Sequence, residues 1–260
     1  MLKMPPNPAE VPLTDYSQHL INSESEPVNP RVETLEMPLR KILLALKERL
    51  NNGEVNLLIG DDASGRSPAL IIKKVVDEVY EEKNIPKPGL IFIAGGETIQ
   101  SEDESLDEIP EINQERVKKI KLHLEKLINQ GLIAEKSNNL HKTVLIITEG
   151  MFSGYGLREL IQALRKIGLP TEVVSVYVPS DASAAEFEDR LGVKIYHGTT
   201  DAGLIVALHE DKTASGVSKK PGQIFAQPHT NETGTRENLQ PSRNSISNVA
   251  ARLTAWYEQS

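Results

Sequence analysis

The feature that most constrains the fold is the regular alternation of short apolar runs with amphipathic stretches of helical length through the middle of the chain. The mostly apolar runs have the length of strands and are bounded by polar residues, Gly or Pro; they cover residues 55–59, 90–94, 144–147, 173–178 and 193–196. Strands with so few polar positions are typical of a parallel sheet that helices cover on both faces. The sequence therefore predicts a single α/β domain with a central parallel sheet.

Between these runs, apolar residues recur at helical spacing. Amphipathic helices are predicted at residues 39–46, 71–79, 117–128, 157–164 and 184–191. A further segment at the end of the chain carries Ile246, Val249, Leu253 and Trp256 at the same spacing. We expect this C-terminal helix to dock on the domain or on a second subunit.

The domain is flanked by two polar segments. Residues 1–35 form a Pro-rich arm with only scattered apolar side chains, which is too little apolar surface to offset the entropy of ordering. Residues 213–260 comprise a polar linker and the C-terminal amphipathic helix. The α/β domain is thereby assigned to residues 36–212, and the two tails are compatible with a homodimer.

Composition excludes several classes of function. The 260 residues carry a net charge of −8 and contain no cysteine, which excludes disulfides, thiolate metal sites and cysteine nucleophiles. The acidic balance argues against a nucleic-acid partner, which favours a basic face. No apolar stretch has the length of a membrane span, and the N-terminus shows no secretory signal, so we expect a cytoplasmic protein.

The most informative stretch is the one that leaves the third predicted strand. Thr148 and Glu149 end that strand, and Ser153, Gly154 and Gly156 lead directly into a helix. Unpaired N–H groups and the positive dipole end at a helix start favour a phosphate, and glycine allows an anion to approach the backbone closely. The alternative interpretation is a tight turn that requires glycine, with Ser153 as the helix cap.

This stretch resembles the signature of the type I phosphoribosyltransferase family, which has an apolar strand, two adjacent acids and a Thr/Ser-Gly-x-Thr turn that opens a helix. The resemblance places Thr148 and Glu149 at the acids that hold the ribose hydroxyls. It places Ser153, Gly154, Tyr155 and Gly156 at the turn that holds the 5′-phosphate. The chain departs from the signature at Thr148, which has no charge, and at Gly156, which has no hydroxyl.

The order of the predicted elements resembles the same family over about residues 36–212. The resemblance places Ser64, Gly65 and Arg66 near the pyrophosphate of phosphoribosyl pyrophosphate (PRPP). It implies a glycosyltransferase that transfers the phosphoribosyl group to a base or an amine, with Glu149 and Arg66 as catalytic residues. It also implies that Mg²⁺ binds together with PRPP if the protein is catalytic. The six histidines show no metal-binding spacing.

Two observations leave other functions open. The predicted lid, residues 97–111, is strongly acidic, and no Lys or Arg occurs between Lys87 and Arg116. Such a lid repels a pyrophosphate, which favours a non-catalytic protein of the same fold that binds a nucleotide monophosphate as a regulatory or assembly module. Residues 60–67 also come close to the G-x-x-x-x-G-K-[ST] spacing of a P-loop, with Arg66 in place of lysine, so a degenerate nucleotide hydrolase is a third hypothesis.

Overall fold

The computed structural model describes residues 26–95, 111–131, 142–204, 217–218, 223–228 and 239–260. Its centre is a five-stranded sheet in the order β2-β1-β3-β4-β5, in which every neighbouring pair is parallel. The strands are β1 (Val55–Asp61), β2 (Gly89–Ile93), β3 (Thr143–Gly150), β4 (Thr171–Tyr177) and β5 (Ile195–Thr199). The predicted α/β class and the predicted parallel sheet are confirmed.

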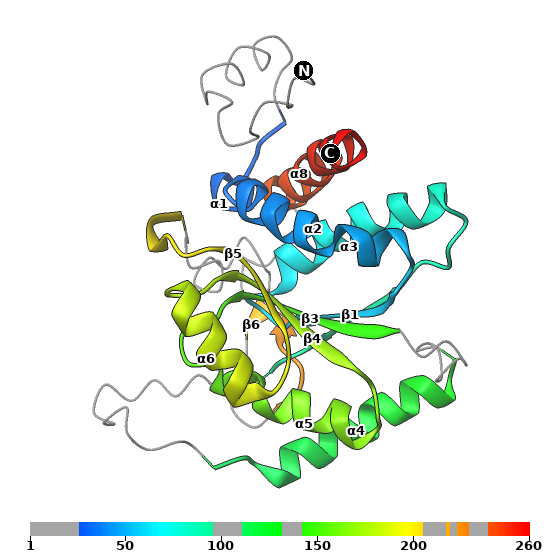
Figure 1. The fold of residues 1–260 in the computed structure, drawn as a ribbon, viewed down its shortest axis with the longest axis vertical. Coiled ribbons are helices and arrows are strands. Elements are labelled where there is room, and N and C mark those ends of the chain that lie inside the picture. The colour runs from blue at the N-terminus through cyan, green and yellow to red at the C-terminus, as the bar shows by residue number, and fades with distance from the viewer. Residues whose placement is uncertain (1–25, 96–110, 132–141, 205–216, 219–222, 229–238) are drawn as a thin grey trace, which may run out of the picture.

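Helices cover both faces of the sheet (Figure 1). The longer ones are α2 (Glu36–Asn51), α3 (Arg66–Glu82), α4 (Gln114–Asn129), α5 (Arg158–Lys166), α6 (Asp181–Leu191) and α8 (Gln240–Gln259). The short elements are α1 (Pro30–Glu33), the 3-10 helices η2 (Tyr155–Leu157) and η3 (Ala202–Leu204), and the pair β6 (Val217–Ser218) and β7 (Gln227–Pro228). In the described ranges, no helix has both the length and the apolarity of a bilayer span.

Successive residues of β3 divide between two hydrophobic cores. Leu145 and Ile147 pack with α2, α3 and α8, whereas Val144 and Ile146 pack with α4, α5 and α6. All four side chains are fully buried. This alternation follows from the pleat of a strand, and burial on both faces explains why the run is apolar at every position.

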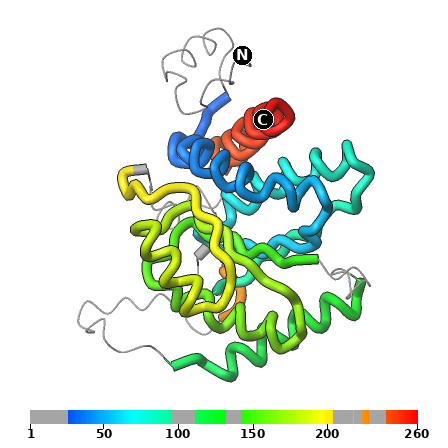
Figure 2. Tube along the Cα trace, in the orientation of Figure 1, coloured from blue at the N-terminus to red at the C-terminus, as the bar shows by residue number. Residues whose placement is uncertain are grey.

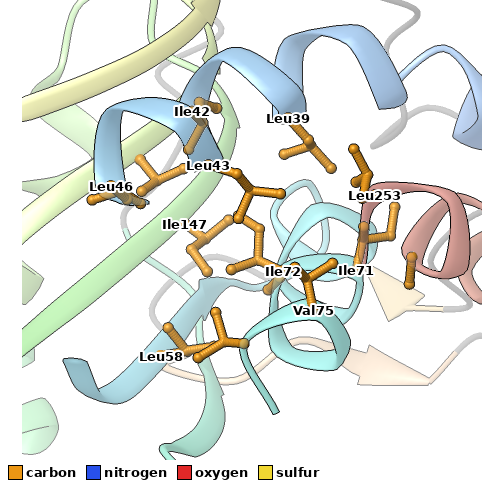
Figure 3. Packing of buried hydrophobic residues seen from close by; sticks show 14 of the residues in the cluster. Leu39, Ile42, Leu43, Leu46, Leu58, Ile71, Ile72, Val75, Ile147 and Leu253 are labelled. Carbon is orange, nitrogen blue, oxygen red and sulfur yellow. The ribbon is translucent and has the colours of Figure 1, made fainter. Parts of the chain in front are cut away.

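The core that contains α2, α3 and α8 joins the two ends of the chain to the sheet. Figure 3 shows Leu43 of α2, Ile72 of α3 and Leu253 of α8 in one cluster with Ile147 of β3. Val249 and Leu253 of α8 are fully buried, so the C-terminal helix docks on its own domain, which is the first of the two predicted alternatives. Figure 2 shows the red end of the trace beside the blue N-terminal helices.

The last residues of the predicted N-terminal arm belong to this packing. The side-chain amide of Asn29 donates to Ser242 Oγ, and its backbone N–H donates to Ser245 Oγ, each at 2.9 Å. Val32 of α1 is fully buried. Residues 26–35 therefore hold α8 in place, while residues 1–25 lie outside the described part of the chain.

A charged network closes the edge where the strands begin. Arg49, at the end of α2, pairs with Glu54 at 2.9 Å and donates to Thr143 Oγ1 at 2.7 Å. It also pairs with Glu172 and donates to Tyr196 Oη. One guanidinium thus fastens α2 to residues at or next to the beginnings of β1, β3, β4 and β5.

Tyr80 gives a test of this packing. Its buried phenol donates to Val55 O at 3.0 Å and accepts from Val55 N at 3.1 Å, which fastens α3 to the start of β1. Burial raises the pKa of Tyr80 to about 12. Because the folded value lies above the unfolded value of about 10, its contribution to stability is complete below about pH 10 and is lost as the pH rises towards 12.

We expect Tyr80→Phe to lower the free energy of unfolding by about 1–3 kcal/mol at about pH 8, because both polar groups of Val55 lose a buried partner. Urea unfolding at about pH 8 and about pH 11 measures this loss. The variant should lose less stability between the two pH values than the parent. A residual decline is expected from Tyr257, whose pKa burial also raises to about 12. If the free energy of unfolding fell as much in the variant as in the parent between these pH values, the role given to Tyr80 would be contradicted.

Candidate functional site

The strand order creates one place where the connections diverge. The connection from β1 to β2 runs through α3 on one face, whereas the connection from β3 to β4 runs through α5 on the other face. Since β1 and β3 are neighbours, their carboxyl ends flank a topological switch point. Ligands of open parallel sheets bind outside the carboxyl ends of the strands at such a point. We therefore take this switch point as the candidate site.

Asp61, the last residue of β1, is the centre of a hydrogen-bond cluster there. Thr148 Oγ1 donates to Asp61 Oδ2 at 3.2 Å, and the backbone N–H of Gly95 donates to Asp61 Oδ1 at 2.8 Å. Gly60 pairs with Ile147, which brings Asp61 beside Thr148 in the register. The cluster joins the ends of β1, β2 and β3. Sequence reasoning did not include Asp61 among the site residues. The assignment of Thr148 to the ribose hydroxyls stays a prediction.

Glu149 lies at the same end of β3. Adjacent residues of a strand point to opposite faces, so Glu149 and Thr148 face opposite sides of the sheet. Glu149 is only 4% exposed. A carboxylate at this position accepts hydrogen bonds from hydroxyl groups, as the interpretation of Glu149 as a ribose-binding acid requires. Its side chain is therefore buried near the end of β3.

The turn after β3 has a left-handed glycine and backbone amides that donate no hydrogen bond among the described residues. Gly154 has a φ of +74°, and the backbone N–H of Tyr155 donates to Ser153 Oγ at 3.4 Å. Within the described part of the chain, the N–H groups of Ser153, Gly154 and Gly156 donate no hydrogen bond. A Cβ on Gly156 would meet nothing within 4 Å, so open space lies beside this glycine. Free amides beside open space are what a phosphate requires.

Two arginines that sequence reasoning missed lie along this turn. Arg190 of α6 donates from Nη1 to Ser153 O at 2.7 Å, and its guanidinium lies 4.8 Å from the centroid of the Tyr155 ring. Arg158 of α5 lies 5.5 Å from the same centroid. The Tyr155 side chain thus holds two cations beside the turn. The pattern around Ser153 gives no hint of Arg190, because α6 is distant in sequence.

The loop after β1 is closed against the sheet. The backbone N–H of Gly65 donates to Asp61 O at 2.7 Å, and a Cβ on Gly65 would lie 2.1 Å from Ile147 O. Ser64 Oγ lies 3.5 Å from Asp61 Oδ2, which is a weak hydrogen bond at best. Gly65 therefore allows this loop to pack closely on β3. No space for a ligand lies beside its α-carbon.

Arg66, predicted to contact pyrophosphate, has a partner within the protein. Its Nε and Nη2 atoms donate to Asp62 Oδ1 at 3.1 and 2.8 Å, and its guanidinium stacks 4.3 Å from the centroid of the Phe92 ring. Asp62 is 2% exposed. The cation therefore compensates a buried carboxylate, and a ligand at Arg66 would share the guanidinium with Asp62.

Part of the predicted polar linker returns to this edge. In segment 223–228, the N–H of Ala226 donates to Asp62 Oδ2 at 3.0 Å, and the N–H of Ala94 donates to Ile224 O at 2.9 Å. Buried Arg116 of α4 donates to Gln223 O at 2.6 Å. The segment thus packs beside the loop after β1 and extends the folded unit beyond the predicted boundary at residue 212.

Among the described residues, no group of three or more His, Asp or Glu side chains is placed to hold a metal ion. His197 of β5 and Asp181 of α6 do meet, with Nε2 and Oδ1 2.8 Å apart. The acidic residues 97–110 lie outside the described part of the chain, so their role as a lid stays a prediction.

Comparison with known proteins gives no relative. The chain matches no model of a protein family, and no curated protein matches it. The resemblance to type I phosphoribosyltransferases therefore stays a prediction based on the motif residues.

The two glycines of the site give a matched test of the geometry. We expect Gly65→Ala to lower the free energy of unfolding by about 3 kcal/mol or more, because the new Cβ collides with the backbone oxygen of Ile147. Gly156→Ala should change it by less than about 0.5 kcal/mol, since open space lies there. Equal changes in the free energy of unfolding for the two variants would contradict the crowded environment of Gly65 and the open environment of Gly156.

Proposed function

We propose that the switch point binds a phosphoribosyl ligand, either PRPP or a nucleoside monophosphate. The observation that carries the proposal is the turn after β3, at a carboxyl end of the parallel sheet. Among the described residues, the N–H groups of Ser153, Gly154 and Gly156 donate no hydrogen bond, and open space lies beside Gly156. The phosphate of the ligand occupies this turn. Arg158 and Arg190 lie along the same turn, and Arg190 also pairs with Glu186 of its own helix.

Glu149 supports the ribose half of the proposal. It is the next-to-last residue of β3, which leads into the turn, and the proposal places the ribose beside its carboxylate. The Thr148 hydroxyl bonds to Asp61 and leaves Glu149 as the acid that remains from the motif. Mg²⁺ in such sites is held by one or two carboxylates together with ligand phosphates, so the site does not require three protein ligands.

Transfer of the phosphoribosyl group is the reaction proposed for this site. A nitrogen of a base or an amine forms a bond to the anomeric carbon of PRPP, the bond from that carbon to pyrophosphate breaks, and the nitrogen releases its proton to water. Arg66 is the cation proposed to stabilise the leaving pyrophosphate, and its pairing with Asp62 already neutralises part of its charge. This pairing favours the second candidate function, a module of the same fold that binds the ligand without transfer.

The geometry gives less support to a nucleotide hydrolase of the P-loop type. Gly60 lies within β1, and a Cβ there would collide at 2.6 Å with the ring of Phe92 in the neighbouring strand β2, so this glycine makes room for that ring. Gly65 is pressed onto Ile147 O, and Arg66 is paired with Asp62. A phosphate nest requires open backbone amides at this loop instead.

Gly156 offers a sharp test of ligand binding. We expect Gly156→Asp to weaken binding of ribose 5-phosphate roughly 100-fold or more, because a carboxylate then lies beside the phosphate. Gly156→Asn has nearly the same size without the charge and should bind within about tenfold of the parent. Calorimetric titration with and without Mg²⁺ measures both.

The parent chain must bind ribose 5-phosphate, PRPP or AMP in this titration. Binding of none of them by a folded parent would end the proposal. An equal loss of affinity in the Gly156→Asp and Gly156→Asn variants would show that the size of the new side chain weakens binding and that its charge does not. Pyrophosphate release from PRPP with a panel of bases then separates the transferase from the binding module.

A further inference from the structure

An aromatic side chain lies exposed at the start of the phosphate turn. Phe152 is 68% exposed, the largest exposure of any large hydrophobic side chain among the described residues. It directly precedes Ser153 in the chain. An exposed ring costs free energy of hydration that burial against a ligand would recover. Its position next to the turn makes it a candidate for contact with the proposed ligand.

The Phe152 ring is supported from one side only. It lies against Tyr177 at the end of β4, with ring centroids 5.4 Å apart and an angle of 49° between the planes. Tyr177 is itself 7% exposed, so it forms a fixed wall. Gly150 pairs with Tyr177, and a Cβ on Gly150 would lie only 3.4 Å from Phe152 Cε2. These contacts position the ring and leave most of it uncovered.

The surroundings of the ring combine apolar and cationic character. Phe152 lies at one end of the turn, and the cations Arg158 and Arg190 lie around Tyr155, three residues further along the chain. A ligand that contacts both the Phe152 ring and the arginines carries an aromatic group and an anion close together. A nucleoside monophosphate has this composition, whereas a sugar phosphate without a base offers nothing to the ring.

We propose that Phe152 is the surface on which the base of a nucleoside monophosphate stacks, so that the ligand class of this site is a nucleotide. The inference rests on the proposed function, which places the phosphate at Ser153–Gly156. Stacking of a base on an aromatic side chain strengthens binding roughly 5- to 150-fold. It tolerates different bases, since every base has an aromatic face.

The test compares AMP with ribose 5-phosphate by calorimetric titration of the full chain. We expect the parent to bind AMP roughly 5- to 150-fold more tightly than ribose 5-phosphate. Phe152→Ala should remove this difference and leave the affinity for ribose 5-phosphate unchanged. Phe152→Tyr should retain the difference. Leu122→Ala, which truncates another exposed apolar residue on α4, serves as the matched control and should change neither affinity.

The outcomes separate this inference from the proposed function. Binding of neither compound by the folded parent overturns both. Equal binding of the two compounds by the parent overturns the stacking role alone. A Phe152→Ala variant that loses both affinities equally, with an unchanged melting temperature, also overturns it, because Phe152 then shapes the phosphate turn. If the parent is a dimer in sedimentation and Phe152→Ala is a monomer, the ring covers a second copy and the inference fails.

Discussion

Helices cover both faces of the parallel sheet, and this burial is the constraint on which the rest of the structure depends. Val144, Leu145, Ile146 and Ile147 are buried in succession, so a polar side chain in the middle of β3 would have no partner. Polar and charged groups of the strands therefore collect where the strands begin and end. Arg49 fills the edge where the strands begin, so the proposed ligand is placed at the opposite edge, where the strands end.

At the carboxyl ends, much of the charge is balanced within the protein. Asp61 accepts from Thr148 and Gly95, and Asp62 accepts from Arg66 and Ala226. Buried carboxylates need such partners because desolvation without them is costly. The same partners draw Thr148 and Arg66 away from a ligand. Among the described residues, the N–H groups of Ser153, Gly154 and Gly156 donate no hydrogen bond, and this difference is why we propose the ligand on this side of the switch point.

Binding and catalysis place different demands on this edge. The turn, Glu149 and Phe152 lie on one short stretch of chain, so a phosphate, a ribose and a base can be matched by residues close in sequence. Stabilising a leaving pyrophosphate requires a cation from the neighbouring loop, and Arg66 is there but paired with Asp62. A ligand that displaces Asp62 from Arg66 would convert a binding site into a catalytic one, because transition-state charge requires a preorganised partner.

The sequence by itself determined the elements and the fold class, because apolar runs and helical spacing are local consequences of burial. It also located the turn from Ser153 to Gly156, since a short turn draws its geometry from its own glycines. Only the tertiary structure decided which groups meet there. Strand order brought Asp61 to Thr148, and helix packing brought Arg190 to Ser153, because contacts between distant residues depend on topology and leave no trace in local spacing.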